Sequence, residues 1–456
     1  MNKADELGAW PINKLILHYA VPSIISLVIS SMYTIVNRIF IGHIPGVGAL
    51  ALTAIGLTAP VTTFLFSIAA WIAVGASSSI SIRLGQGKKA EAEALAGHAL
   101  LLSVLVGLVL SLLYTLLQDP LFRWLGIRGE GLSYAKDYMD ILMWGAVFQL
   151  QSFLFPNLIR ASGNPRFSAV ITAAGCLLNI GLDVLFINLL QFGIRGAAMA
   201  TVLSQLVMAG AGAFYFAKGK SVLLLARRHF ALTPPVLKPM LLIGMVPFMN
   251  QMSISISQAV SNYALARYGG EAYIASMAAI TSVIYMALMI VNGFSQASQT
   301  IAGFNYSRGS PTRAFQTLAL SVGYSSAAML VGFGIMQGFP GFWAKLFSPD
   351  PQLIEVATEG LRLYSFVVIL APLFLIGSGF MMVTGKPKTA LALVISKQCL
   401  ILMPLTLLLP PLMGTNGLWL AQPFTDLMIG VAVAVILLKL YKPVRETVSR
   451  KESVQL

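Results

Sequence analysis

The chain has 456 residues, of which 57 % are hydrophobic and only 10 % charged, and its formal net charge is +14. Soluble domains carry roughly 25 % charged residues, so this composition excludes a water-soluble enzyme. Long unbroken apolar runs exclude an outer-membrane β-barrel, and two cysteines, Cys176 and Cys399, are too few for a disulfide framework or a zinc cluster.

Apolar runs long enough to cross a bilayer follow one another along the whole chain. They cover about 15–41, 50–82, 95–117, 134–158, 167–189, 196–217, 239–265, 272–300, 315–338, 360–383, 389–412 and 417–440. We therefore predict an all-α polytopic membrane protein with twelve transmembrane helices.

Basic residues are divided unevenly between the two sides of the membrane. If the N-terminus is cytoplasmic, the cytoplasmic segments carry 21 Lys and Arg and the outer segments carry 7. This bias predicts a multi-pass protein of the cytoplasmic (inner) membrane with both termini in the cytoplasm. Loop topology also accounts for the net charge, so we expect no nucleic-acid partner.

The predicted helices fall into two groups of six. The polar connection 218–238 separates an N-terminal lobe (1–217) from a C-terminal lobe (239–440), and a cytoplasmic tail follows at 441–456. Because each lobe has an even number of helices, two related lobes would share one topology. Transporters commonly place their substrate path between such halves.

Short motifs of the first lobe recur in the second at a shift of about 220–225 residues. This spacing indicates an internal duplication. The pairs are Val21-Pro22 with Val246-Pro247, Asn37 with Asn262, Ser162-Gly163-Asn164-Pro165-Arg166 with Thr384-Gly385-Lys386-Pro387-Lys388, and Gly193 and Gly196 with Gly414 and Gly417.

A set of motifs in the first lobe carries a family resemblance. They are Val21-Pro22, Tyr33 and Asn37 followed by Phe40-Ile41-Gly42, Leu84-Gly85-Gln86-Gly87, Arg160-Ala161-Ser162-Gly163-Asn164-Pro165, Leu178-Asn179-Ile180-Gly181-Leu182-Asp183 and Gly193-Ile194-Arg195-Gly196-Ala197-Ala198. Together they resemble the multidrug and toxic compound extrusion (MATE) family, in its DinF-like bacterial branch, over essentially the whole chain.

The resemblance implies two six-helix lobes around a central cavity. It also implies a secondary active multidrug exporter, working by alternating access, that antiports amphipathic or cationic compounds against protons, with sodium as the alternative ion. We expect no enzymatic activity and no cofactor. The expected partners are small molecules and membrane lipids, and the expected state is a monomer.

Asp183 is the acidic residue placed deepest in an N-terminal span. It lies about sixteen residues into the fifth helix, roughly 24 Å from the cytoplasmic end. A carboxylate at that depth is costly and indicates a functional site, and Asn179 stands one turn earlier on the same face. We predict that Asp183 is the ion-coupling residue for protons. A protonated Asp183 held by neighbouring helices is the structural alternative.

Further site residues are implied by the resemblance. Many relatives carry an aspartate where this chain has Asn37, an amide that cannot titrate. Either this branch works with an amide, or an Asp→Asn exchange has removed the charge. Asn157 and Thr201 match polar positions of the family's N-terminal pocket. With Asn37, Asn179 and Asp183 they form the predicted ion-coupling set, and Asp183, Asn179 and Thr201 are the candidate Na⁺ ligands.

Candidate substrate contacts combine polar and adaptable side chains. The C-terminal lobe has no carboxylate in the middle of its first, second or fourth helix and offers amides instead. Such amides either hydrogen-bond a ligand or join helices, and methionine thioethers repack easily around varied ligands. The predicted substrate-binding residues are Tyr33, Asn37, Met32, Gln258, Asn262 and Met286.

Two further charges lie inside spans of the second half. Lys397 is near the cytoplasmic end of the eleventh helix, so we expect it to extend toward the interface. Asp426 is roughly nine residues into the twelfth, near the midplane. It is a secondary coupling candidate, with a structural ion pair or hydrogen bond as the favoured interpretation.

Two alternative functions remain open from the sequence. A membrane-embedded enzyme would need a nucleophile–base pair or metal ligands within the spans, but the four histidines are scattered near span ends or in loops, and there is no Gly-x-x-x-x-Gly-Lys nucleotide motif. A flippase for lipid-linked precursors would need several cationic residues in the cavity, and this chain offers few.

Overall fold

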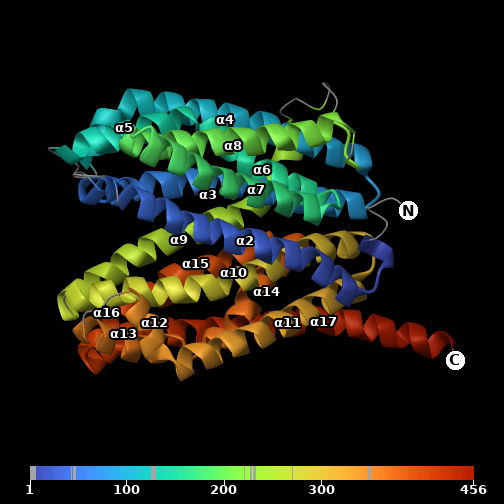
Figure 1. The fold of residues 1–456 in the computed structure, drawn as a ribbon. Coiled ribbons are helices and arrows are strands. Elements are labelled where there is room, and N and C mark those ends of the chain that lie inside the picture. Colours follow the sequence, from blue (N-terminus) through green and yellow to red (C-terminus); the bar gives the residue numbers. More distant parts are fainter. Residues whose placement is uncertain are drawn as a thin grey trace. The chain divides into compact units, whose positions relative to one another are not determined.

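The computed structural model describes residues 7–42, 44, 48–124, 130–219, 221–225, 229, 233–269, 271–347 and 351–455. Over this part of the chain the regular structure is helical throughout and contains no strand (Figure 1). The predicted all-α class is therefore confirmed.

The helices of the first half are α2 (Ile12–Gly42), α3 (Gly48–Gly85), α4 (Lys89–Trp124), α5 (Glu130–Trp144), α6 (Ala146–Ala161), α7 (Pro165–Asp183), the π-helix η1 (Val184–Leu189) and α8 (Gly193–Ala217). The second half contains α9 (Pro234–Tyr268), α10 (Glu271–Ser307), α11 (Pro311–Gly338), α12 (Pro340–Phe347), α13 (Pro351–Tyr364), the short 3₁₀ turn η3 (Val368–Leu370), α14 (Ala371–Val383), α15 (Pro387–Ile395), the π-helix η4 (Ser396–Leu402), α16 (Met403–Met413) and α17 (Asn416–Gln455).

Ten of these helical stretches are long and apolar enough to cross a membrane, and two bent pairs reach that length together. The first pair joins α5 and α6 at 53°, and the second joins α13 to the stretch Val368–Val383 at 45°. Counting each pair as one span gives the twelve that the sequence predicts.

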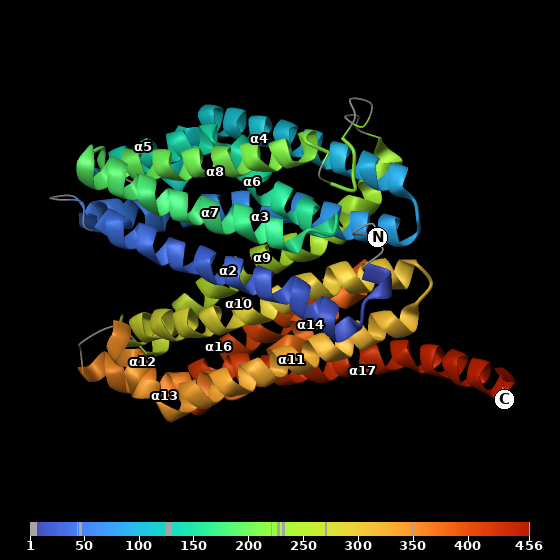
Figure 2. The same cartoon turned by 45° about the vertical axis from the view of Figure 1, so that its right-hand side comes forward.

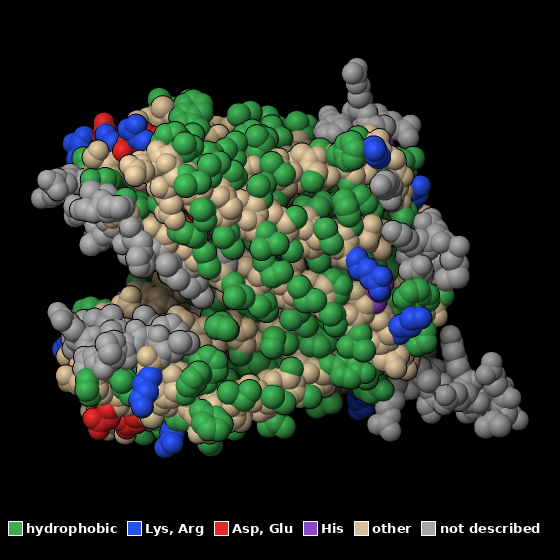
Figure 3. All heavy atoms as spheres, viewed as in Figure 1, with side chains coloured by type: hydrophobic (Ala, Val, Ile, Leu, Met, Phe, Trp, Pro, Cys, Tyr) green, Lys and Arg blue, Asp and Glu red, His purple; other side chains and the backbone are tan. Residues whose placement is uncertain are grey.

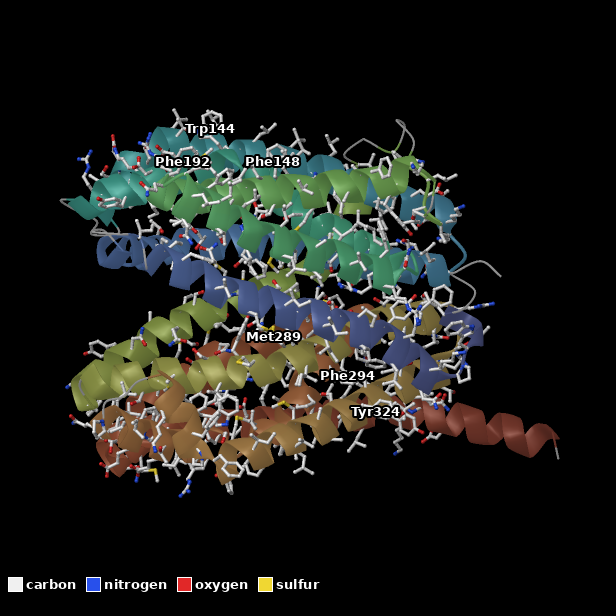
Figure 4. All side chains as sticks on the ribbon, in the orientation of Figure 1. Trp144, Phe148, Phe192, Met289, Phe294 and Tyr324 are labelled. Carbon is white, nitrogen blue, oxygen red and sulfur yellow. The ribbon has the colours of Figure 1, made fainter. Side chains whose placement is uncertain are left out.

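The two predicted spans at 134–158 and 360–383 are bent in the structure, a feature that hydropathy does not predict. In the first, Gly145 separates α5 from α6, and a Cβ on this residue would lie 2.4 Å from a methyl carbon of Val202. Close packing against α8 therefore requires glycine at the bend. Trp144 is 68 % exposed beside it, on the outer surface of its bundle (Figure 4). The second bend lies about 222 residues further on, at the equivalent place in the repeat.

The outward faces of the helices are apolar. On α4, Leu108, Leu112 and Leu116 are all more than half exposed, and Leu116 is 67 % exposed. Hydrophobic side chains cover the middle of the visible surface, whereas Lys and Arg lie toward the helix ends (Figure 3). Large apolar side chains exposed along whole helices are stable in lipid and not in water. The chain is a multi-pass membrane protein.

The chain forms two compact units. Ile25–Phe248 belongs to unit 1, whereas Trp10–Ile24 and Met249–Leu456 form unit 2. The first helix of each repeat, α2 or α9, therefore divides between the units. These boundaries differ from the predicted lobes, in which each of the two helices belongs to one lobe.

Close backbone contacts explain why the first helices divide. A Cβ on Gly244 of α9 would lie 2.0 Å from the carbonyl oxygen of Trp71 on α3, and the Trp71 indole donates to the Leu241 carbonyl at 2.8 Å. In unit 2, a Cβ on Gly293 of α10 would lie 2.3 Å from the Ile24 side chain of α2. Glycine lets each pair of helices approach closely, as is usual at membrane helix crossings.

The connection between the repeats packs against α4 of unit 1. The Glu93 carboxylate accepts a hydrogen bond from the Leu224 amide at 3.0 Å, and His98 Nε2 lies 2.8 Å from the Thr233 hydroxyl. Gly97, between them, leaves room for the His229 backbone. The described residues of the predicted linker 218–238 are thus anchored to a helix by side chains.

Aromatic contacts mark the core of unit 2. The rings of Phe294 on α10 and Tyr324 on α11 lie side by side, with centroids 6.4 Å apart (Figure 4). Tyr273 stacks on Trp419 at 5.6 Å, joining α10 to α17. Helix α17 continues to Gln455, so the described part of the predicted tail at 441–456 is helical (Figure 2).

Candidate ion-coupling site

Asp183 is fully buried in unit 1 at the end of α7. Its side chain is 0 % exposed, and neither carboxylate oxygen has a hydrogen-bond partner among the described residues. Buried polar atoms are nearly always satisfied, and an isolated buried carboxylate is strongly disfavoured. This side chain therefore has to bind either a proton or a cation.

The sequence of α7 determines where Asp183 lies. Asn164 caps the helix by accepting from the Phe167 amide at 3.3 Å, and Pro165 occupies its first turn. A Cβ on Gly175 would lie 2.2 Å from the Met208 sulfur, so glycine allows α7 to approach α8 closely. This approach brings the polar face of α7 against α8 one turn before Asp183.

Asn179, one turn before Asp183, contacts α8. Its amide nitrogen donates to the Thr201 hydroxyl at 3.5 Å, and that hydroxyl donates to the Ala197 carbonyl at 3.0 Å. The amide oxygen of Asn179 is buried and has no donor among the described side chains. This oxygen and the two oxygens of Asp183 are therefore three buried acceptors on one helix face. A bound proton or cation would satisfy them.

One contact between α2 and α7 indicates the height of Asn37. A side-chain hydrogen bond joins Cys176 of α7 to Ser30 of α2. Ile41 of α2 and Ile187 of η1 belong to one buried cluster and are separated in the sequence by the same number of residues as Ser30 and Cys176, as expected if α2 and α7 run parallel. Asn37, seven residues after Ser30 and 8 % exposed, therefore lies at the height of Asp183.

An apolar cluster closes the site on the side away from the start of α7. It contains Ile41, Ile44, Ile187, Ile194 and Ala197, with Tyr134 and Tyr138 packed against it. Excluding water from this side strengthens every electrostatic interaction at Asp183.

The backbone after Asp183 is irregular. It continues as the π-helix η1, and the turn to α8 contains Gln191 at φ 55° and Gly193 at φ 57°. π-helices often occur at functional sites, because the wider turn redirects side chains. Hydrophobic periodicity does not predict the π-helix η1. The segment Gln191-Phe192-Gly193 predicts the turn that follows but not the π-helix itself.

Asn157 does not join this group. Its amide donates to the Phe153 carbonyl at 2.8 Å, and its oxygen accepts from Arg160. The neighbouring Pro156 carbonyl accepts from Ser168, near the start of α7. Ser168 precedes Asp183 by fifteen residues, or about 22 Å along the helix. The structure therefore separates this predicted coupling residue from Asp183.

The predicted substrate contacts are distributed over both units. Met32 in unit 1 and Met286 in unit 2 are 56 % and 44 % exposed. Gln258 and Asn262 are also exposed, and they contact each other at 3.5 Å on α9. The side chain of Tyr33 lies outside the described residues.

In unit 2, the prediction that Lys397 extends toward the membrane interface is wrong. Its ammonium does not extend to the interface but pairs with Asp426 at 2.8 Å, and both side chains are nearly buried. The pair could not be predicted from nearby residues, because its two members lie on different spans.

Up to twelve apolar spans in the described residues, an internal repeat and an unpaired buried carboxylate within one span are typical of a secondary membrane transporter. The sequence model of the MatE family matches residues 22–185 and 248–408. The chain belongs to this family, whose members are membrane transporters and not enzymes.

Characterised relatives match over nearly the full length. A FAD transporter of Shewanella oneidensis is 25 % identical, covering 96 % of this chain and 97 % of the relative. The multidrug export protein MepA of Staphylococcus aureus is also 25 % identical, covering 93 % of each chain.

Solved structures show the same fold. A crystal structure of MATE in complex with MaL6 is 22 % identical with a TM-score of 0.92, covering 98 % of this chain and 100 % of that one. An outward-facing multidrug resistance MATE family transporter of the MOP superfamily is 24 % identical with a TM-score of 0.89, covering 94 % and 95 %.

Proposed function

We propose that this protein is a secondary active exporter of amphipathic, cationic compounds, driven by proton exchange at Asp183. The relative MepA is a multidrug export protein, which supports the substrate class. The observation that carries the coupling mechanism is the set of three buried acceptor oxygens on Asp183 and Asn179.

The exchange follows from the charge on Asp183. A proton arriving from outside neutralises the carboxylate and forms a hydrogen bond to the free oxygen of Asn179, one turn away. Losing the negative charge weakens the attraction for a cationic compound, which is then released. When the proton leaves toward the cytoplasm, the charge and the affinity return. Reciprocal coupling of this kind is what antiport requires.

The oxygen atoms around Asp183 are better suited to binding a proton than to binding a sodium ion. Hard cations prefer roughly six oxygen ligands, whereas the described side chains offer the two oxygens of Asp183 and one of Asn179. The Thr201 hydroxyl already donates to Ala197 and accepts from Asn179. One proton on Asp183 satisfies the site with fewer partners.

A transport assay tests the proposed function. Purified protein in proteoliposomes is given a fluorescent organic cation and an imposed pH gradient, with a sodium gradient in a parallel series. We expect uptake driven by the pH gradient alone. FAD serves as the competing substrate class, because one relative transports it. No uptake of the cation under either gradient would contradict the exporter.

The orientation is tested by reporter fusions. We propose that both termini are cytoplasmic, on the basis of the excess of basic residues there. Fusions after Ser221 and after Leu456 should report a cytoplasmic location, and a fusion near Asp350 should report the outside. An outside signal at Ser221 would overturn the arrangement of two six-span repeats.

Substituting Asn37 tests whether α2 takes part in coupling at Asp183. Asn37→Asp should move the half-maximal export rate to higher pH by about one unit, because two facing carboxylates hold a shared proton more tightly. The measurement is the pH profile of uptake in matched proteoliposomes, with Asn13→Asp, at an exposed position near the start of the same helix α2, as the control. Coincident profiles for the parent protein and the Asn37→Asp variant would mean that α2 does not contribute to coupling.

A further inference from the structure

Unit 2 contains a buried ion pair that the proposed mechanism does not use. Lys397 Nζ lies 2.8 Å from Asp426 Oδ1, and the two side chains are only 11 % and 12 % exposed. Both residues fall inside candidate spans, Pro387–Met413 and Asn416–Val444. The pair therefore lies in the apolar interior of a membrane-spanning bundle.

The surroundings of the pair are polar on the acidic side and aromatic on the basic side. The Gln422 amide donates to both carboxylate oxygens of Asp426, at 3.1 and 3.0 Å. The Lys397 ammonium lies 4.3 Å from the centroid of the Phe374 ring on α14. Tyr364 on α13 is a further titratable group close to Asp426. The carboxylate is thus well solvated by protein, whereas the ammonium depends on Asp426 and one ring face.

Stability alone does not account for such a pair. Removing two charges from water is costly, and apolar residues of similar volume often hold helices together as well or better. Ionisable residues inside membrane spans usually serve ion or substrate pathways. A role in exchanging charge explains why unit 2 carries this arrangement.

The local backbone of the pair resembles that of Asp183. Lys397 is the second residue of the π-helix η4, which separates α15 from α16. In unit 1, Asp183 immediately precedes the π-helix η1. The fifth span of each repeat therefore holds a buried ionisable residue at the start of a π-helix, a backbone feature that frequently occurs at functional sites.

We propose that Lys397 and Asp426 form a second proton-exchange site, so that each unit binds one proton in a transport cycle. This proposal rests on the proposed function, because it requires a proton-driven cycle. When Lys397 gives its proton to water it becomes a neutral amine, and the Asp426 carboxylate keeps its two hydrogen bonds from Gln422. Unit 2 then carries one more negative charge and attracts a cationic compound. Binding of a proton at Lys397 restores the ion pair and removes this attraction, and protonation of Asp183 acts in the same direction.

The test replaces both charges with neutral amides of similar size, in the double variant Lys397→Gln/Asp426→Asn. This change avoids an unpaired buried charge. The measurement is the substrate gradient reached at steady state under an imposed pH gradient, with the membrane potential clamped. Losing one proton per cycle lowers that gradient about tenfold for each pH unit imposed, and this is the expected result. An unchanged gradient would show that the pair only joins η4 to α17.

A matched control separates this effect from the general loss of an ion pair. Lys136 and Asp119 form a pair at the same kind of distance, 2.7 Å, but exposed at the end of α4. The double variant Lys136→Gln/Asp119→Asn should leave the steady-state gradient unchanged. A decrease equal to that of the unit 2 variant would overturn the proposal.

A second variant gives an answer if the double variant does not fold. Asp426→Glu keeps both charges and changes only the position of the carboxylate. We expect its export to show a shifted pH profile, because proton exchange at the pair changes. An unchanged profile would overturn the proposal.

Asp183→Asn distinguishes the two proposals. If it loses proton-driven export while the unit 2 variants match the parent protein, the proposed function stands and the second site is rejected. If Asp183→Asn keeps its pH-driven export, the proposed role of Asp183 fails, whatever the unit 2 variants show.

Discussion

Asp183→Asn should lose proton-driven export while retaining the fold. Asparagine has nearly the shape of aspartate but cannot take up or release a proton. Its amide group also supplies a donor for the free oxygen of Asn179, so the buried acceptors become better satisfied. We therefore expect export under a pH gradient to fall by about tenfold or more, with unchanged or higher thermal stability.

The measurement is uptake of a fluorescent cation into proteoliposomes containing equal amounts of parent and variant protein. Binding of the same cation, measured without a gradient, should persist. Asp119→Asn, at an exposed carboxylate on α4, is the matched control and should export normally. If the Asp183→Asn protein exports at the parent rate and still responds to pH, the coupling residue lies elsewhere, and Asp426 is the next candidate.

Gly244→Ala should destabilise unit 1. The added Cβ would lie 2.0 Å from the Trp71 carbonyl oxygen, a rigid backbone atom, and 2.7 Å from the Trp71 indole ring. Helices α3 and α9 would have to separate, which also strains the hydrogen bond from the indole to the Leu241 carbonyl. Overpacking of this kind costs about 1–3 kcal/mol.

The effect is measured as the midpoint of thermal unfolding in detergent, together with the export rate. Gly210→Ala is the control, because Gly210 lies in a helix of the same unit with open space around it. That substitution should be neutral or slightly stabilising, since alanine is the better helix former. Equal unfolding midpoints for the two variants would show that the α3–α9 crossing adjusts easily.

The course of α9 makes this crossing important for function. The helix begins in unit 1 and continues in unit 2 beyond Phe248. Its attachment to α3 is made at Gly244, four residues before that boundary. A substitution that loosens the attachment should therefore reduce the export rate as well as the stability.

Much of the architecture could be predicted from the sequence, because it depends on local properties. Hydropathy over about twenty residues decides whether a segment prefers lipid, so the spans and their order follow from composition. The depth of Asp183 follows from counting residues along one helix. Its pairing with Asn179 on one face is likewise a matter of helical periodicity.

Other features depend on contacts between segments far apart in the chain, and only the tertiary structure decided them. Lys397 pairs with Asp426 because η4 packs beside α17, and no pattern within either helix indicates that neighbour. Asn157 is separated from Asp183 by the register of α6 against α7, which the Ser168–Pro156 hydrogen bond sets. The sequence determined which residues are polar within the membrane. Packing between helices determined which of them meet, because hydrogen bonds and ion pairs in an apolar interior require contact at about 3 Å.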